Sequence, residues 1–348
     1  MNSLFKTSVA AALITVIYPS NANEVSTHLT TIIEPTPIKR VNPRYPMDAA
    51  KNNREGWAKL SFVIGTDGLV LNVLVTETSG SKDFAAAASR AVSQWEFTPA
   101  FADGKAIEQC VNTVQMNFKM DSGGAQGATR KFRRKYEKAL AALQAKDYEQ
   151  TKQVLDEMSK IKKMHLSESN YMHLLAADYA QQINDKPLQL FHLRRVWLDT
   201  TNEENAEREL STLNSILMLE ISLNQLQNAY GTYKRIIKRE AAAPYLENYK
   251  KLIGKIDAFI GSDKNIVVQG NIKEDDFWYA ALVRKEFSII DVKGALNKLD
   301  IRCANKRHVY SLEENNTWKL PDSWGKCSIY VYGEDNATFN LVEHPQKS

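Results

Sequence analysis

Hydrophobic and polar positions follow three different patterns along the chain. Between residues 42 and 120, apolar and polar side chains alternate over short runs, which is typical of strands with one buried face. From 128 to 260, apolar residues recur at i, i+3 and i+4, which is typical of helices. From 264 to 345, short apolar runs return between polar turns. The chain is therefore predicted to hold an α+β region, then an all-α region, then a small all-β region of the sandwich type.

The first region is predicted to fold as a short helix, a hairpin, a longer helix and a last strand. The short helix spans Met47 to Asn52, and strands at 58–64 and 69–75 flank a Gly-Thr-Asp-Gly turn. The longer helix is predicted from apolar residues that recur at helical spacing, and Ser81, which precedes them, is its expected N-cap. The residues expected to face the core are Ala58, Leu60, Phe62, Ile64, Leu69, Leu71, Val73, Val75, Phe84, Ala88, Ala91, Val92 and Trp95.

The last strand of this region is predicted from Gln109 to Met120. Its alternation divides the side chains between two faces, one buried and one in solvent. The residues expected to face the core are Cys110, Val114, Met116 and Phe118, and those expected to face solvent are Thr113, Gln115 and Asn117.

Several short motifs occur in a characteristic order over about 80 residues. They are NPRYP followed by AA, then GWAKLSFVIGTDG, then a helix ending in WEFTPA, then the turn DGK before a strand of alternating polarity. In this order the region resembles the C-terminal domain of the TonB family. The resemblance implies a three-stranded antiparallel sheet with two helices on one face. It also implies binding of a short extended peptide, the TonB box of an outer-membrane receptor, by addition to the sheet edge.

The predicted binding residues follow from this resemblance and from the physics of sheet edges. The last strand lies at an edge, where unpaired N–H and C=O groups can accept another strand. The expected peptide-binding residues are Gln109, Val111, Thr113, Gln115, Asn117 and Tyr45. Alternatively, the edge stays in water, and Tyr45 only packs while Pro43 and Pro46 steer the chain across the sheet.

The N-terminal residues predict export to the periplasm. Lys6 precedes an apolar stretch from Val9 to Tyr18, and Ser20-Asn21-Ala22 places small residues where a signal peptidase reads. We expect cleavage after Ala22; the alternative is an uncleaved segment that anchors the chain in the inner membrane. Energy-transducing TonB proteins join an anchor to this domain through a long Pro-rich spacer, whereas only Glu34-Pro35-Thr36-Pro37 precedes it here. Coupling to the inner-membrane motor is therefore left open.

The middle of the chain is predicted to contain paired helices. Helix breaks at 146–147, 184–185 and 224–225 recur 38 and 40 residues apart, which favours an α-solenoid resembling degenerate tetratricopeptide repeats. A plain helical bundle is the alternative. A basic run from Arg130 to Lys135 fits either an anionic lipid or acidic surface, or a solvated helix face. The predicted divisions are 1–22 signal peptide, 35–121 TonB-like domain, 122–127 linker, 128–262 helical repeats and 263–346 β domain.

The three cysteines gain meaning from the predicted export, because disulfides persist in oxidising compartments. Cys303 and Cys327 each lie in a strand-like run near the C-terminus, so they are predicted to pair. Closing this loop stabilises the fold by about 3 kcal/mol in the chain-entropy model. Cys110 is expected to remain a buried free thiol.

Composition and motifs limit the function classes. The formal net charge of +4 arises from 45 basic and 41 acidic residues, a balance that gives no reason to expect nucleic acid. The sequence contains no G-x-S-x-G, Walker or dinucleotide motif, and its six histidines lack metal spacing, so neither an enzyme nor a cofactor is predicted. The expected partner is a peptide of an outer-membrane transporter. The alternative is a non-catalytic scaffold whose helical repeats bind another envelope protein. The oligomeric state is not predicted.

Overall fold

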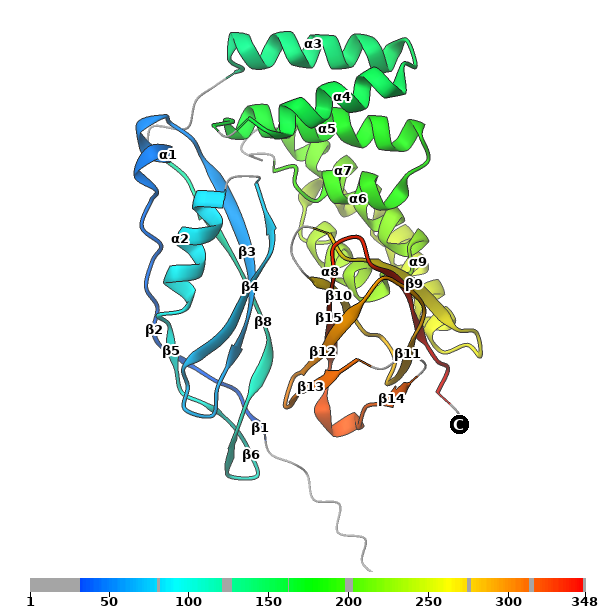
Figure 1. Ribbon diagram of the computed structural model, residues 1–348. Helices are drawn as coiled ribbons and strands as arrows, with labels where there is room; N and C mark the ends of the chain where they lie inside the picture. Colours follow the sequence, from blue (N-terminus) through cyan, green and yellow to red (C-terminus); the bar gives the residue numbers. More distant parts are fainter. Residues whose placement is uncertain are drawn as a thin grey trace, which may run out of the picture.

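The computed structural model shows three regions of different architecture (Figure 1). They are the N-terminal domain (32–120), the helical region (127–261) and the C-terminal sandwich (266–346). This arrangement confirms the predicted fold class. The structure describes residues 32–79, 82–120, 127–161, 163–197, 203–273, 277–312 and 316–346. The predicted signal peptide, its cleavage site and the Ser81 cap lie outside these residues.

The N-terminal domain is built on a three-stranded antiparallel sheet with the order β4-β3-β8. The strands are β3 (Gly56–Ile64), β4 (Val70–Thr78) and β8 (Gln109–Phe118). Two helices cover one face, α1 (Met47–Lys51) and α2 (Lys82–Val92). Short pairings below the sheet involve β1 (Ile32–Ile33) with β6 (Ala100–Ala102), β6 with β7 (Lys105–Ile107), and β2 (Pro37–Lys39) with β5 (Glu96–Phe97).

Apolar alternation on β3 accounts for the packing of α2. Leu60, Phe62 and Ile64 all face the helix and are almost fully buried. Gly56 brings α2 close at the start of the strand, because a Cβ atom there would lie 2.6 Å from Phe84 Cδ2. The α2 residue Phe84 is itself 1% exposed. Any residue other than glycine at position 56 would therefore push the helix away from the sheet.

Two irregularities change the predicted facing of side chains. The β3–β8 register shifts between Phe62 and Ile64, so that Ile64 pairs with Gln109 and Phe62 with Asn112. Cys110 therefore does not share the face of Val114, Met116 and Phe118, and that prediction was wrong. The β3–β4 register also shifts, and Val70 is buried while Leu69 and Leu71 are exposed, contrary to the expected core positions. An extra residue in a strand reverses the alternation beyond it.

The helical region consists of three helix pairs followed by a last helix (Figure 1). The helices are α3 (Arg130–Gln144), α4 (Tyr148–Ser159), α5 (Leu166–Gln182), α6 (Lys186–Leu193), α7 (Glu203–Ser222), α8 (Leu226–Ile236), η1 (Glu240–Tyr245) and α9 (Leu246–Ile260). The turn inside each pair contains one residue with positive φ, namely Lys146, Asn184 and Asn224. The helical middle is thus confirmed, whereas tetratricopeptide repeats remain a prediction. The basic side chains Arg130, Lys131, Arg133 and Arg134 are exposed on α3.

The C-terminal sandwich packs two four-stranded antiparallel sheets around an apolar core. One has the order β10-β15-β12-β13 and the other β14-β11-β16-β9. Their bounds are β9 Ile266–Asn271, β10 Phe277–Ala281, β11 Glu286–Lys293, β12 Leu296–Cys303, β13 Arg307–Ser311, β14 Thr317–Lys319, η2 Asp322–Trp324, β15 Cys327–Gly333 and β16 Thr338–Glu343. Trp278, Trp318 and Trp324 pack against this core.

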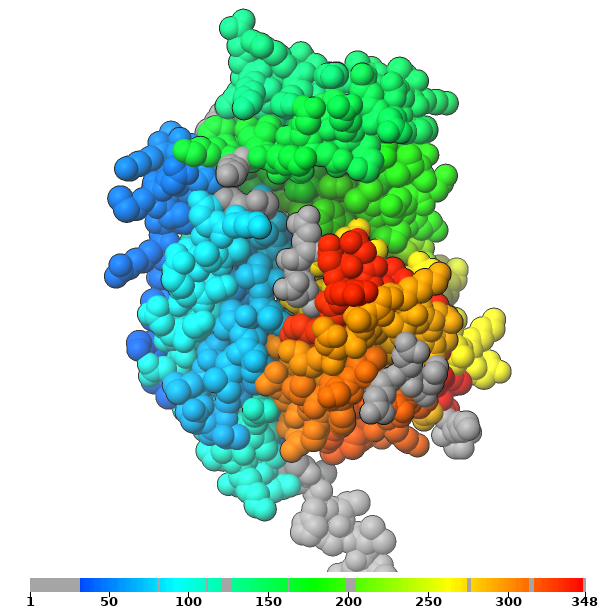
Figure 2. Space-filling model, in the orientation of Figure 1, coloured from blue at the N-terminus to red at the C-terminus, as the bar shows by residue number. Residues whose placement is uncertain are grey.

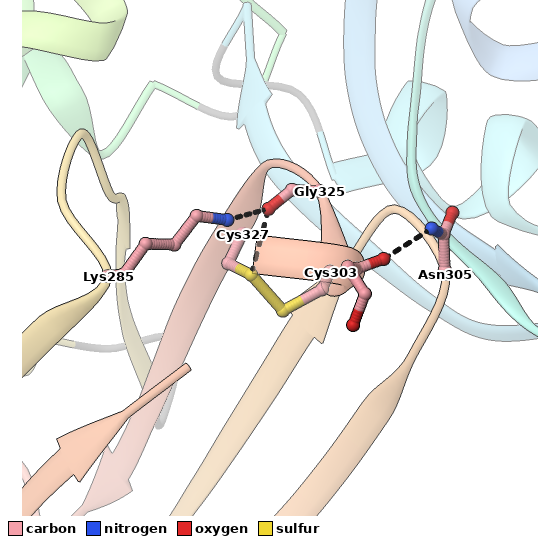
Figure 3. Close-up of a disulfide and its surroundings, with 6 residues drawn as sticks. Lys285, Cys303, Asn305, Gly325 and Cys327 are labelled. Carbon is pink, nitrogen blue, oxygen red and sulfur yellow. Dashed lines mark hydrogen bonds between the residues drawn. A yellow bond between two sulfur atoms is a disulfide. The ribbon is translucent and has the colours of Figure 1, made fainter. Parts of the chain in front are cut away.

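Cys303 and Cys327 face each other across β12 and β15. They are direct partners in the strand register, and their sulfur atoms lie 2.08 Å apart (Figure 3). The surrounding turn is held by Lys285, whose ammonium donates to the Gly325 carbonyl, and by Asn305. The geometry is therefore that of the predicted disulfide.

The sandwich covers the second face of the N-terminal sheet. Trp57, Ser61 and Val63 point away from α2, yet each is at most 3% exposed. Ser61 Oγ shares a 2.8 Å hydrogen bond with the Tyr330 hydroxyl of β15, and Arg302 of β12 donates to the Asn72 carbonyl of β4. Figure 2 shows the two domains in contact. The expectation of one buried and one wet face therefore fails along β3, because another domain of the same chain packs there.

A buried arginine joins the last helix to the sandwich. The guanidinium of Arg284 donates to the carbonyls of Phe259, Ile260, Ser262, Lys264 and Glu343. Four of these carbonyls belong to the end of α9 and the connector that follows it, where helical carbonyls lack partners within the helix. Arg284 therefore closes the helix and positions the first strand of the sandwich.

Candidate functional site

The outer side of β8 is an open sheet edge. β3 lies between β4 and β8, and among the described residues no strand pairs with β8 on its other side. An edge of ten residues presents a row of main-chain donors and acceptors that can be extended by another strand. The chemistry of the site is therefore main-chain hydrogen bonding.

The register identifies which main-chain groups point outward. The Trp57 carbonyl accepts from the Ser79 N–H at 3.0 Å, so Trp57 directs its main-chain groups toward β4. In a strand the main-chain groups of residues i and i+2 point the same way, so Lys59 and Ser61 do likewise. Their partners on β8 are Asn117, Gln115 and Thr113, in non-hydrogen-bonded pairs. These three β8 residues consequently direct their N–H and C=O groups to the open edge.

The predicted binding residues on β8 fall into two groups. The side chains of Thr113, Gln115 and Asn117 are exposed, and Gln115 Nε2 donates to Asn117 Oδ1 at 2.9 Å. Gln109 lies beyond the register shift on the α2 side and donates to Glu34 Oε2 at 2.6 Å. Gln109 therefore does not continue the row formed by the other three. The side chain of Val111 lies outside the described ones.

Tyr45 belongs to the core rather than to the open edge. Its ring contacts Phe84 and Phe118 edge-on, and its hydroxyl donates to the Arg54 carbonyl at 2.6 Å. Burial, with a smaller contribution from Glu55, raises the pKa of this phenol to about 12. These contacts agree with the alternative expectation that Tyr45 only packs, because its ring contacts two phenylalanines and its hydroxyl is hydrogen-bonded to the main chain.

The structure contains a cavity next to β8 that the sequence did not predict. It has a volume of about 330 Å³ and lies between the extended segment 34–40 and the sheet. The lining residues are Glu34, Pro35, Pro37, Arg40, Phe62, Ile64, Trp95, Phe97, Gln109, Asn112, Thr113 and Val114. The Arg40 guanidinium lies over the rings of Trp95 and Phe97, and no described carboxylate is within ion-pairing distance of it. The cavity thus offers an aromatic base and a cation beside the edge strand.

Comparison with known proteins decides the family. The sequence model described as the Gram-negative bacterial TonB protein C-terminal domain matches residues 41–120. The TonB2 protein of Vibrio anguillarum has a solved structure with 31% identity, covering 33% of this chain and 98% of that one, at a TM-score of 0.21. Residues 41–120 belong to the TonB C-terminal domain family. A solution structure of the Pseudomonas aeruginosa TonB C-terminal domain is 29% identical over 25% of this chain and 87% of that one, at a TM-score of 0.23. No curated protein matches.

TonB membership gives the functional context of the N-terminal domain. The family is associated with transport and is not enzymatic, its domains are periplasmic in Gram-negative bacteria, and they interact with outer-membrane transporters. The match ends at Met120, before the helical region and the sandwich. In the described part of the chain, no helix is long and apolar enough to span a bilayer, and no group of three potential ligand side chains forms a metal site.

Charged groups of the sandwich surround the start of the TonB edge strand. Cys110 is 1% exposed, and burial followed by the charge of Glu108 raises the pKa of its thiol to about 12. Arg302 and Arg307 act on the same thiol in the opposite direction. β12 of the sandwich packs against β8, and the side chains of Thr113, Gln115 and Asn117 nevertheless remain exposed.

Proposed function

We propose that this TonB-family protein binds an extended, TonB-box-like peptide of an outer-membrane transporter by adding it as a fourth strand to β8. The observation that carries the proposal is the outward direction of the main-chain groups of Thr113, Gln115 and Asn117. These three alternate residues form non-hydrogen-bonded pairs with β3, so their outward N–H and C=O groups supply donors and acceptors at the spacing of a sheet ladder.

Selectivity comes from side chains on the two faces of the added strand. Successive residues of an extended peptide point to opposite faces. Those on the α2 side reach the cavity, where Arg40 provides hydrogen-bond donors and a positive charge beside an aromatic base. Backbone pairing thus provides general affinity, and the cavity favours a subset of peptides.

The cellular setting belongs to the same proposal. We expect the mature chain to begin after Ala22 and to act in the periplasm, with its helical region and sandwich accompanying the TonB domain. Coupling to the inner-membrane motor is not part of the proposal.

The test is a titration of the mature full-length chain with TonB-box-like peptides from receptors of the same organism. Gln115→Pro removes one outward N–H and leaves the neighbouring residues, which pair with β3, intact. We expect about tenfold weaker binding from the lost hydrogen bond and the added ring. Gln115→Ala keeps the N–H, so its affinity should stay within about twofold of wild type.

Both variants must unfold at temperatures near that of wild type, which thermal melts would check. A wild-type chain that binds none of these peptides would reject strand addition, as would a folded Gln115→Pro variant that binds as tightly as wild type. The scaffold function of the helical region would then be the better explanation.

A further inference from the structure

The helix α3 carries a concentration of positive charge that the rest of the chain does not share. It holds six basic residues and one acidic residue, a net charge of +5, whereas the whole chain of 348 residues has a net charge of +4. The residues outside α3 are therefore close to neutral when taken together. The positive charge of this protein is gathered on one helix.

The packing of α3 directs this charge outward. Phe132, Ala139 and Leu143 are buried against α4 and α5, and Figure 1 shows α3 beyond these two helices, at the end of the helical region. Residues three and four apart on a helix share a face, so the opposite side of α3 points away from the protein. The exposed cations there, named the basic face, are Arg130, Lys131, Arg133, Arg134 and Lys138.

The cations of the basic face differ from their neighbour Lys135, which forms an ion pair with Glu157 of α4. Within the described part of the chain, no carboxylate pairs with any of the five. Lys135 lowers the pKa of Glu157 most, and Lys138 and Lys160 lower it further, so Lys160 lies near the same face. Lys160 is exposed at the end of α4 and extends the positive surface. These charges are free to attract an external anion.

The placement of the charges along α3 works against the stability of the helix. Arg130, Lys131 and Arg133 lie among its first four residues, where no acidic residue occurs. The start of a helix carries a partial positive charge, so cations are unfavourable there and anions are favoured. Local rules of stability are broken in this way mainly at functional sites. The basic face therefore has the character of a functional surface.

We propose that the basic face of α3 docks on a membrane surface that contains anionic phospholipids. Each Lys or Arg held near such a surface is attracted to it, and the attraction adds up over the face. A tight protein interface depends instead on large anchors that enter pockets, and no exposed large apolar side chain belongs to α3. A convex face built from charge alone thus fits a plane of lipid headgroups better than an acidic protein. This inference is independent of strand addition to β8.

The experiment measures sedimentation of the mature chain with lipid vesicles. This chain begins after Ala22 and so lacks the apolar N-terminal stretch, which could itself enter a bilayer. Wild type should bind vesicles of phosphatidylglycerol and phosphatidylcholine in equal parts, should not bind phosphatidylcholine alone, and should be released by high salt. The triple variant Arg130→Gln, Arg134→Gln and Lys138→Gln should bind the mixed vesicles at least about tenfold more weakly.

The matched control removes three exposed lysines from α8 and α9, by Lys234→Gln, Lys251→Gln and Lys255→Gln. It loses the same charge and should bind within about twofold of wild type. Glu137→Lys makes the opposite change, since it adds a cation between those of the basic face, and should tighten binding at least about threefold.

Thermal melts check that the variants fold. The triple variant should melt no lower than wild type, because Arg130→Gln removes a cation from the start of the helix. If it melts lower, Glu137→Lys decides, and unchanged binding by that variant would overturn the proposal. Wild type that does not sediment with the mixed vesicles would overturn it too, as would equal weakening by the control. Binding to polyglutamate without binding to vesicles would assign the basic face to an acidic protein instead.

Discussion

Arg302 shows how a single buried side chain can specify a domain interface. It is 1% exposed, donates twice to Asp300 at 3.0 Å, donates to the Asn72 carbonyl and lies 4.3 Å from the ring centre of Tyr330. Burying a guanidinium is costly unless its donors find partners, and here they do. Asp300 and Tyr330 belong to the sandwich itself and hold the guanidinium in place, so the Asn72 carbonyl is the partner that a shifted docking would remove.

The cysteines provide a prediction at the same scale. We expect the exported protein to contain a Cys303–Cys327 disulfide and an unmodified Cys110, since the first two face each other and the third is buried. With its pKa raised to about 12, the Cys110 thiol is protonated at pH 8 and should not react with iodoacetamide in the folded protein. In urea the same thiol should react readily.

Non-reducing peptide mapping with and without urea measures both points. A peptide linking Cys110 to either of the other cysteines would contradict the pairing. The raised pKa of Cys110 also makes the free energy of unfolding depend on pH. Because the thiol loses its proton more easily when unfolded, this group lowers the free energy of unfolding as the pH rises from about 9 to about 12.

The turns within the three helix pairs illustrate structure at the scale of elements. Lys146, Asn184 and Asn224 occupy the same place in successive pairs, each with φ between 56° and 59°. In two of the pairs the next residue is an aspartate that caps the second helix, Asp147 or Asp185. Asparagine tolerates this left-handed conformation, whereas lysine adopts it at a cost.

Replacement of the lysine should therefore stabilise the helical region. Lys146→Gly is expected to raise the free energy of unfolding by about 0.5–1 kcal/mol, since glycine adopts positive φ without strain. Asn184→Gly is the matched control and should change it by less than about 0.5 kcal/mol. Urea denaturation of both variants provides the measurement. A Lys146→Gly protein less stable than wild type would show that its side chain stabilises the turn.

Much of the element structure was predictable from the sequence, and the exceptions have physical causes. The alternation of Leu60, Phe62 and Ile64 predicted β3 and its buried face, and the turn residues predicted the hairpin. The facing of Cys110 and Gln109 was not predictable, because a register shift leaves no period in the sequence. The open edge followed from the TonB resemblance, whereas the cavity did not, since the segment 34–40 that closes it has no regular pattern.

At the scale of the whole molecule, both faces of the TonB sheet are covered by the same chain. α2 covers one face and the sandwich the other, with Trp57 and Val63 buried between the domains. The sequence pattern could not predict this second burial, because Lys59 and Ser61 on the same face are polar. The edges are consequently the parts of the sheet that another molecule can reach.

A truncated TonB domain should behave differently from the full chain. A fragment of residues 32–120 exposes Trp57 and Val63, so we expect it to self-associate as its concentration rises. Light scattering after gel filtration would measure this. Val63→Lys in the fragment should reduce the association, because it places a charge in the exposed face. A fragment that stays monomeric at all concentrations would show that the second face does not need a cover.

The contacts of Arg284 have a consequence for how this chain can vary. Its guanidinium donates to four carbonyls between Phe259 and Lys264. These hydrogen bonds fix the length of the connector after α9, although the connector lies outside any helix or strand. One inserted residue there would displace several acceptors at once and act like a defect in the core. The tip at Asp103 and Gly104 is exposed, and an added Cβ at Gly104 meets no atom within 4 Å, so lengthening of the chain should be accommodated there instead. Tolerance to insertion in this protein is thus set by the hydrogen bonds of a loop, and loops that look alike in sequence differ in how much change they permit.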